Sequence, residues 1–187
     1  GSSHRVSFIS VPFEDVVSQI FKDVSQPYMG VMLKRLMLLA SEKIADSLGI
    51  DALVTGESVA QVSSQTLRNL ALIDQCTNKL VLRPLSMMSK PDIIEIAQKI
   101  GTRRFAEAMP EYCGVISKNP VTHGSYERME KEARGFDYSI LDEAVKKASF
   151  VNVDEIDENV GEIGQMEIIS DLSNAEYTVI DIRQTPD

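Results

Sequence analysis

Two short apolar segments separated by a helical pattern constrain the fold of this chain more than any other feature. Residues 52–55 (ALVT) and 80–82 (LVL) are too short for helices and consist mostly of residues that favour buried strands. Between them, residues 66–73 carry apolar side chains at helical spacing. Strand, helix and strand in this order predict a βαβ unit, and therefore an α/β fold in which helices flank a parallel sheet.

Apolar residues at helical spacing predict five further helices, and an alternating segment predicts one more strand. The strand is expected over residues 5–11 and the helices over 13–24, 31–48, 90–100, 125–133 and 138–148. Pro27 and Gly30 are expected to interrupt the chain between the first two helices, and Gly49 to end the second. Ser89 is a suitable N-cap for the third helix.

Polar residues follow both strands of the βαβ unit, at the edge where parallel sheets bind ligands. Gly56-Glu57 follows the first strand, and Arg83-Pro84 follows the second. Because ligands of such sheets bind beyond the carboxyl ends of the strands, we expect a site there. A glycine at a strand end lets a nucleotide approach the backbone closely, although Gly56 also suits a simple tight turn.

The acidity of the chain is confined to its last fifth. The net charge is −9, yet residues 1–150 contain 18 lysines and arginines against 18 acids, whereas residues 151–187 contain one arginine and ten acids. A neutral body lacks the surplus of basic residues that holds phosphates, so most of any grip on RNA is expected to come from elsewhere. We expect a first domain over 1–150, an acidic linker over 151–176 and the opening strand of a second domain over 177–187.

Several classes of protein are disfavoured by simple composition. The chain shows neither a signal peptide nor a run of roughly 20 apolar residues, so a cytoplasmic protein without a membrane span is expected. Two cysteines, Cys76 and Cys113, are too few for a disulfide framework. His4 and His123 complete no metal-ligand spacing with them, so no bound metal is expected.

Three stretches are distinctive enough to indicate a family. They are residues 55–70 (TGESVAQVSSQTLRNL), 82–102 (LRPLSMMSKPDIIEIAQKIGT) and 109–120 (MPEYCGVISKNP). Together they resemble the tRNA 4-thiouridine synthetases, or tRNA sulfurtransferases, whose ATP domain belongs to the PP-loop pyrophosphatase group. The resemblance covers nearly all of residues 1–150, and residues 179–183 (VIDIR) resemble the first strand of the rhodanese domain that follows in some members.

The resemblance implies an enzyme, a tRNA uracil 4-sulfurtransferase. Such enzymes bind tRNA through an N-terminal THUMP region and adenylate a uridine with ATP, which is expected together with Mg²⁺. Sulfur then comes from a persulfide on a rhodanese cysteine that a cysteine desulfurase loads. Related proteins also deliver sulfur to a sulfur-carrier protein of thiamine thiazole synthesis.

The same resemblance implies that these residues are part of a longer protein. The Ser-Gly-Gly-x-Asp-Ser phosphate loop and the THUMP region are expected before residue 1, and the rhodanese cysteine beyond residue 187. The 187 residues alone are therefore expected to be inactive. The alternative is a non-catalytic module that binds a partner protein through its acidic tail and helical surface.

Five residues of the body match positions to which the resemblance gives a function. Lys34, Gly56 and Gln65 match ATP contacts, and Arg83 is a weaker candidate for the same crevice. For Lys34 the alternative is a solvated helix lysine. Lys90, at a helix start that already favours anions, is expected to stabilise the leaving pyrophosphate. The alternative for Lys90 is an ordinary lysine of a first helical turn.

Cys113 is the remaining candidate, and it carries the redox chemistry that the resemblance implies. It lies in a loop-like stretch, Pro110-Glu111-Tyr112-Cys113-Gly114, and is expected to form a disulfide with the rhodanese cysteine. That chemistry requires an accessible thiol able to become a thiolate. Cys76 matches no functional position of the family and is expected to be a packing residue.

Overall fold

A computed structural model describes residues 6–59, 62–108, 116 and 119–152. The chain divides into two compact units, of which one holds residues 11–147 and the other the residues on either side. The elements of the first unit are α1 (Glu14–Asp23), η1 (Gln26–Tyr28), α2 (Met29–Leu48), β2 (Ala52–Val54), η2 (Ser63–Gln65), α3 (Leu67–Asp74), β3 (Leu80–Leu82), α4 (Lys90–Lys99), α5 (Arg103–Ala108), α7 (Tyr126–Gly135) and α8 (Ser139–Lys146).

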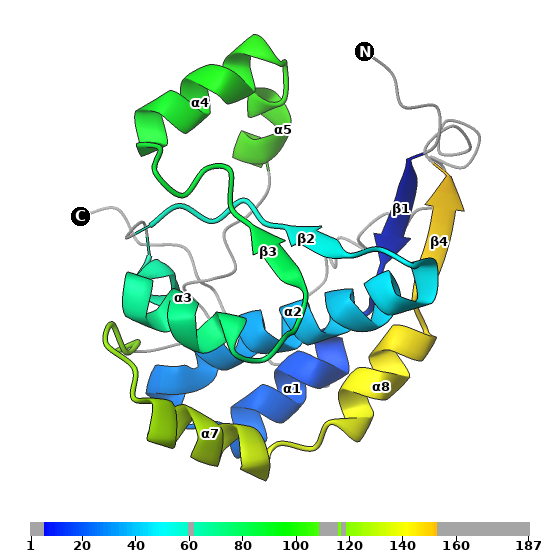
Figure 1. Cartoon of the computed structure of the whole chain (residues 1–187), viewed down its shortest axis with the longest axis vertical. Helices are drawn as coiled ribbons and strands as arrows, with labels where there is room; N and C mark the ends of the chain where they lie inside the picture. Colours follow the sequence, from blue (N-terminus) through cyan, green and yellow to red (C-terminus); the bar gives the residue numbers. More distant parts are fainter. Residues whose placement is uncertain (1–5, 60–61, 109–115, 117–118, 153–187) are drawn as a thin grey trace, which may run out of the picture. The chain divides into compact units, whose positions relative to one another are not determined.

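Strands β2 and β3 form the parallel sheet that the sequence predicts, with α3 as the helix between them (Figure 1). Ala52 pairs with Leu80 and Val54 with Leu82, and a hydrogen bond of 3.0 Å from the Thr55 nitrogen to the Leu82 oxygen extends the pairing. The α/β fold class is therefore confirmed. The extension brings the residues after both strands to one edge of the sheet.

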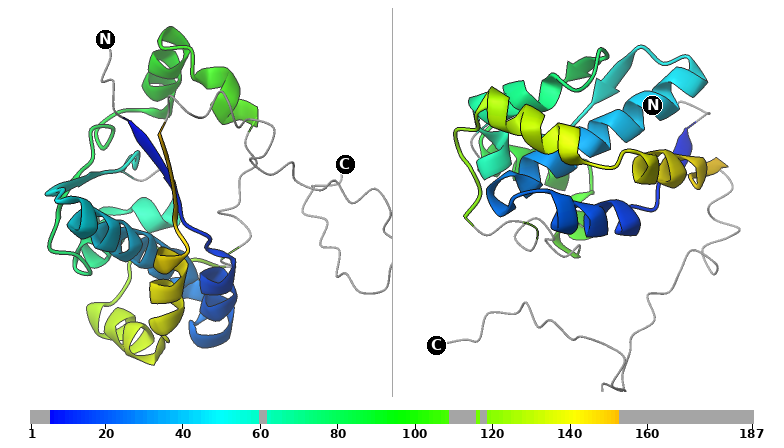
Figure 2. Two further views of the ribbon diagram at one scale, coloured as in Figure 1. Left: turned by 90° about the vertical axis from the view of Figure 1, so that its right-hand side faces the viewer. Right: turned by 90° about the horizontal axis from the view of Figure 1, so that it is seen from below.

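Helix α2 is the centre of the core. Met32, Leu36 and Ala40 are buried. They lie on one face of the helix because residues four positions apart share a face. Figures 1 and 2 show α2 between the β2–β3 sheet and the helices α1, α7 and α8. The core therefore has one long helix with a different layer on each side.

The ends of α2 differ in how well the sequence predicts them. Gly49 ends the helix in the left-handed conformation, with φ 66° and ψ 34°, as expected. Gly30, however, does not interrupt the chain, because it lies in the first turn of α2 directly after η1. The first turn tolerates a glycine because its backbone N–H groups have no partner within the helix.

Helices α4 and α5 contact each other and contain no buried residue. The predicted N-cap of α4 is confirmed: the Ser89 hydroxyl accepts from the Asp92 nitrogen, and Asp92 accepts in return from the Ser89 nitrogen. Helix α5 is not predicted by the sequence. It has only six residues, none of them buried, and Phe105 is 59% exposed. A helix this short, without a buried face, shows almost no helical spacing of apolar residues in the sequence.

The second unit contains an antiparallel pair, β1 (Ser7–Ser10) and β4 (Ser149–Asn152). The strand predicted over 5–11 is thus confirmed as β1, but it does not belong to the parallel sheet. Strand β4 is not predicted, since its partner lies about 140 residues earlier in the chain. The expected linker beyond residue 152 and the strand of a second domain at 177–187 lie outside the described residues.

Candidate functional site

A cavity of about 380 Å³ opens beyond the end of β2, between α2 and η2. Its lining residues are Lys34, Met37, Leu38, Ser41, Val54, Thr55, Gly56, Glu57 and Gln65. Apolar side chains from α2 and β2 form one part of this lining, and charged or amide groups form the other. A cavity with this division can hold a ligand that has an apolar ring and an anionic end.

Three predicted site residues that are far apart in the sequence meet in this cavity. Lys34 comes from α2, Gly56 follows β2, and Gln65 ends η2. The parallel pairing sets the position of Gly56, while the packing of α2 against β2 brings the lysine beside it. The tertiary structure therefore brings together the residues that the sequence nominates.

Two features leave the cavity open to a polar ligand. Apart from the adjoining residues of the chain, no described atom lies within 4 Å of the place where a Cβ on Gly56 would be, so this backbone can be approached closely. The side-chain oxygen Oε1 of Gln65 is buried and has no hydrogen-bond partner among the described residues. A buried acceptor without a partner is costly, and a donor on a ligand would remove that cost.

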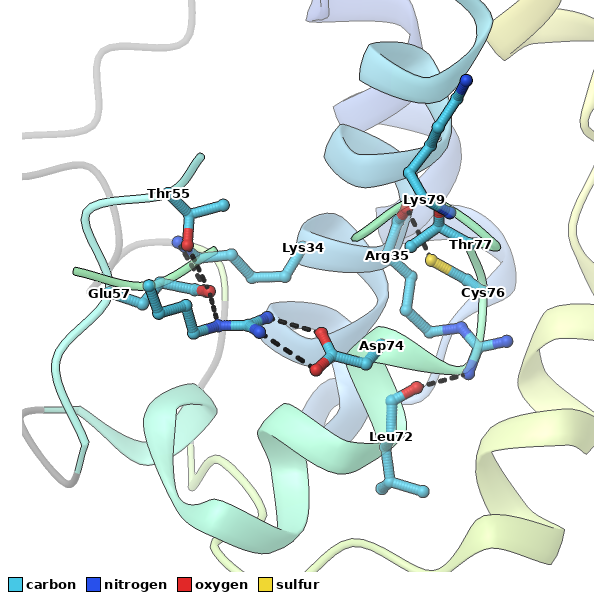
Figure 3. A network of polar contacts seen from close by, with 10 residues as sticks. Lys34, Arg35, Thr55, Glu57, Leu72, Asp74, Cys76, Thr77 and Lys79 are labelled. Atoms are coloured by element: carbon cyan, nitrogen blue, oxygen red, sulfur yellow. Dashed lines mark hydrogen bonds and ion pairs between the residues drawn. The ribbon is translucent and has the colours of Figure 1, made fainter. Parts of the chain in front are cut away.

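Glu57 joins the cationic groups at the edge of the cavity (Figure 3). Its Oε1 lies 3.5 Å from Nζ of Lys34, and its Oε2 accepts hydrogen bonds from Arg83 Nε at 2.9 Å and Thr55 Oγ1 at 3.1 Å. Only 6% of the Glu57 side chain is exposed. The carboxylate holds the lysine beside the cavity and balances its charge.

Arg83 pairs with two carboxylates and is not one of the lining residues of the cavity. Its NH1 and NH2 groups donate to Asp74 at 3.0 and 2.5 Å, in addition to the bond with Glu57. Burial acts to lower the pKa of Arg83, but the hydrogen bonds to Asp74 and Glu57 outweigh it and the pKa is raised. Arg83 does not line the cavity, and its contact with a lining residue is the hydrogen bond to Glu57.

The sequence places Glu57 at the strand end where a site is expected but assigns it no role, and it gives no sign of Asp74. Glu57 directly follows Gly56 in the stretch that resembles the family, and an acid next to a nominated glycine is a signal that could have found it. Asp74 ends the apolar run Leu70-Ala71-Leu72-Ile73, where an acid is unexpected. Both are paired with Arg83: the Glu57 side chain is buried, as acids seldom are without a partner, whereas 44% of the Asp74 side chain is exposed.

Among the described residues, Lys90 is the predicted site residue that lies apart from this cavity and its carboxylate network. Lys90 is the first residue of α4, is exposed, and is not among the lining residues. Cys113 lies outside the described residues. The functions expected for both residues remain predictions.

Cys76 occupies a setting that disfavours thiol chemistry. It is partly buried against the core, and its sulfur donates to the backbone oxygen of Arg35 at 3.4 Å. Burial raises the pKa of the Cys76 thiol to about 11. At neutral pH this thiol is almost entirely protonated and is a poor nucleophile.

Neither a cluster of metal ligands nor a membrane-spanning helix occurs among the described residues. Within them, no three or more His, Cys, Asp or Glu side chains gather in a way that could hold a metal ion. None of the helices there has both the length and the apolar character needed to cross a membrane.

Comparison with solved structures finds a similar protein whose structure contains a bound nucleotide. A crystal structure of a 4-thiouridine synthetase–RNA complex with bound ATP matches with a TM-score of 0.73 and 31% sequence identity. The match covers 80% of this chain and 40% of that chain. At 31% identity the two chains resemble each other in sequence as well as in fold.

Comparison with known sequences gives the family. The tRNA sulfurtransferases of Pseudomonas putida and Saccharophagus degradans are 52% and 51% identical over 183 residues, and that of Escherichia coli O157:H7 is 47% identical over 184. Each match covers 98% of this chain, which spans only 38% of the length of these relatives. The family model described as "Thiamine biosynthesis protein (ThiI)" matches residues 1–138. The chain therefore belongs to the ThiI family of thiamine biosynthesis proteins.

Proposed function

We propose that this chain is part of the ATP-using domain of a tRNA sulfurtransferase that makes 4-thiouridine. In this reaction a tRNA uridine is activated by adenylation with loss of pyrophosphate, and sulfur from a rhodanese persulfide then replaces O4. The observation that carries the proposal is the cavity in which Lys34, Gly56 and Gln65 meet. The bound ATP of the similar 4-thiouridine synthetase supports ATP, expected with Mg²⁺, as the co-substrate.

The lining of the cavity fits a nucleotide. The Lys34 ammonium provides a positive charge for phosphate oxygens, and the free space over Gly56 admits a ribose or base close to the backbone. The buried Oε1 of Gln65 can accept from an amino or hydroxyl group of the nucleotide. Met37, Leu38 and Val54 offer the apolar surface against which a base packs.

Two further residues, Lys90 and Cys113, complete the proposed chemistry. Lys90 stabilises the charge that develops on the departing pyrophosphate, and its place at the start of α4 adds the favourable N-terminus of that helix. The thiolate of Cys113 attacks the inner sulfur of the rhodanese persulfide, which breaks the S–S bond and releases the outer sulfur as hydrosulfide, and hydrosulfide displaces AMP from C4 of the adenylated uridine. The disulfide that forms between Cys113 and the rhodanese cysteine is later reduced by an external thiol reductant. Arg83 serves by holding Glu57, and through it Lys34.

The partners follow from the same proposal. The substrate is tRNA, which is held mainly by regions beyond the neutral body of this chain. A cysteine desulfurase supplies the persulfide, and a sulfur-carrier protein receives sulfur for thiamine thiazole synthesis. The reaction takes place in the cytoplasm.

ATP binding tests the proposal, using the full reading frame that contains these 187 residues. Lys34→Ala and Gln65→Ala should each raise the Kd for ATP roughly 10- to 100-fold, the effect of losing a hydrogen bond to a charged or buried group. Lys43→Ala is the matched control, since Lys43 lies on the same helix, pairs with Asp142 and does not line the cavity. Isothermal titration calorimetry measures the affinities.

The outcome separates the two functions that the sequence allows. A wild-type protein that binds no ATP, or Lys34→Ala and Gln65→Ala variants that bind it as the control does, would refute the nucleotide site. The alternative of a non-catalytic partner-binding module would then be preferred.

A further inference from the structure

Asn69 is fully buried, and its side chain makes three hydrogen bonds that join two separate segments. Its Nδ2 donates to the backbone oxygens of Ser63 at 2.7 Å and Val121 at 2.8 Å. Its Oδ1 accepts from the Gly124 nitrogen at 3.0 Å. Ser63 opens η2, the turn that ends at Gln65, whereas Val121 and Gly124 lie more than 50 residues further along the chain.

Neighbouring contacts show that the segment 121–124 is held in a single position. Thr66 Oγ1 donates to the Thr122 oxygen at 2.8 Å, and Arg68 Nε donates to the Gly124 oxygen at 2.9 Å. A Cβ on Gly124 would lie 2.5 Å from Cδ1 of Leu72 and 2.9 Å from Oδ1 of Asn69, so a larger residue there would force one of these side chains or the segment to shift. The segment is therefore a fixed support against which Asn69 can hold η2.

The turn η2 needs such a support. It has three residues, and no side-chain hydrogen bond caps its N-terminus in the described structure. Its internal hydrogen bond runs from the Gln65 nitrogen to the Val62 oxygen at 2.8 Å, and the bond from Asn69 adds a tie to its first carbonyl. A short turn held in this way presents Gln65, whose buried Oε1 belongs to the lining of the cavity, in one orientation.

We propose that Asn69 is a positioning residue for Gln65: by tying η2 to the segment 121–124, it sets the place of the Gln65 amide in the nucleotide cavity. This inference rests on the proposed function, because it takes ATP as the ligand of Gln65. Asn69 itself touches no ligand, and its effect on ATP passes through Gln65.

Asn69→Asp tests this with a side chain of nearly the same size. The carboxylate keeps the acceptor for Gly124 but places a negative oxygen against the carbonyls of Ser63 and Val121. In the full reading frame, the Kd for ATP should rise roughly 10-fold, as expected for a lost buried hydrogen bond. Glu132→Gln is the control for general destabilisation, because Glu132 is also buried but binds Ser25 and Arg128, away from the cavity.

A double-mutant cycle separates positioning from a merely structural effect. If Asn69 acts through Gln65, then Gln65→Ala combined with Asn69→Asp should bind ATP no more weakly than Gln65→Ala alone. Additive losses, or an equal loss in Glu132→Gln at a matched fall in Tm, would overturn the inference. If Lys34→Ala and Gln65→Ala bind ATP as the wild type does, the nucleotide site itself is refuted. If these two variants bind ATP more weakly but Asn69→Asp does not, only the inference about Asn69 is refuted.

A milder variant covers the case in which Asn69→Asp does not fold. Thr66→Val removes the bond to the Thr122 oxygen and also the N-cap bond that the Thr66 hydroxyl accepts from the Asn69 nitrogen, at a position that is only partly buried. The Kd for ATP should then rise about 3- to 10-fold, up to the equivalent of two weak neutral hydrogen bonds. No rise in this variant would overturn the inference.

Discussion

Glu57 and Arg83 are joined by a hydrogen bond of 2.9 Å, although they follow different strands and lie 26 residues apart in the chain. Only 6% of the Glu57 side chain and 11% of the Arg83 side chain are exposed. The pair sits where the carboxyl ends of β2 and β3 meet, and Glu57 extends it to Lys34 in the cavity. The charge of the proposed nucleotide site is therefore set by a group that also connects the two strands.

Glu57→Ala should destabilise the fold by about 3 kcal/mol, because it leaves the buried Arg83 without one of its two carboxylates. Urea denaturation of the 187-residue chain measures the free energy of unfolding. Glu95→Ala is the control: its exposed pair with Lys99 on α4 should contribute less than about 0.5 kcal/mol. Equal small losses in both variants would show that the Glu57–Arg83 pair does not stabilise the fold.

Lys90→Ala should slow adenylation far more than it weakens tRNA binding. The lysine is proposed to act on charge that grows as pyrophosphate leaves, and one such group typically contributes ~2.7 to 4 kcal/mol to the transition state. Pyrophosphate release and tRNA affinity are measured in the full reading frame, with Lys99→Ala at the other end of α4 as the control. Equal losses in binding and turnover would make Lys90 a ground-state contact instead.

Cys113→Ser should leave adenylation intact and abolish multiple-turnover sulfur transfer, because a hydroxyl does not take part in thiol–disulfide exchange. Without reductant, the wild-type enzyme should accumulate a disulfide between Cys113 and the rhodanese cysteine, which peptide mapping of non-reduced protein detects. A bridge at Cys76, or full activity in Cys113→Ser, would contradict the proposed sulfur transfer.

Cys76→Ser is the matched control for that experiment and should behave as wild type. Because burial raises the pKa of the Cys76 thiol from 9.0 to about 11, Cys76 carries roughly 100-fold less thiolate at neutral pH than a free cysteine. Iodoacetamide should therefore alkylate Cys76 in the native protein about 100-fold more slowly than a free cysteine. Alkylation at the free-cysteine rate would show that the thiol is accessible and ionised.

The buried Glu132 should make stability fall in acid. Burial alone would raise the pKa of Glu132, but the hydrogen bonds from Ser25 and the pairing with Arg128 outweigh it, so the pKa lies below its ordinary value of 4.5. A carboxyl with a lowered pKa in the folded state stabilises above its unfolded pKa and loses that contribution as the pH falls through its folded pKa. Stability should therefore decline as the pH drops below about 4.5.

Glu132→Gln isolates this contribution from those of the other carboxylates. The variant should be less stable than wild type at pH 7 by about 1.5–3 kcal/mol, the value of hydrogen bonds to a charged group. The difference should shrink from about pH 4.5 downward, as thermal unfolding at several pH values would show. A difference that stays constant from pH 7 to 3 would mean that the charge of Glu132 does not stabilise the fold.

The local pattern of the sequence was sufficient for most of the secondary structure. The apolar runs at 52–55 and 80–82 predict β2 and β3, and helical spacing predicts α2 with its end at Gly49. These features depend on neighbours within a few residues, which the sequence displays directly. Strand β4 and helix α5 were missed because the first depends on a distant partner and the second has almost no buried face.

The candidate site also has features that the sequence predicts and features that depend on tertiary packing. The sequence alone determined which residue types lie at the strand ends and, through resemblance to a family, that Lys34, Gly56 and Gln65 belong together. Only the tertiary structure decided that Glu57 links Lys34 to Arg83 and that Asn69 ties η2 to residues 121–124. Apart from the bond between Asn69 and Ser63, which are six residues apart, these links join residues at least 23 positions apart, and contacts at such separation depend on how whole helices and strands pack. That packing is a property of the assembled core, and no local pattern of residues records it.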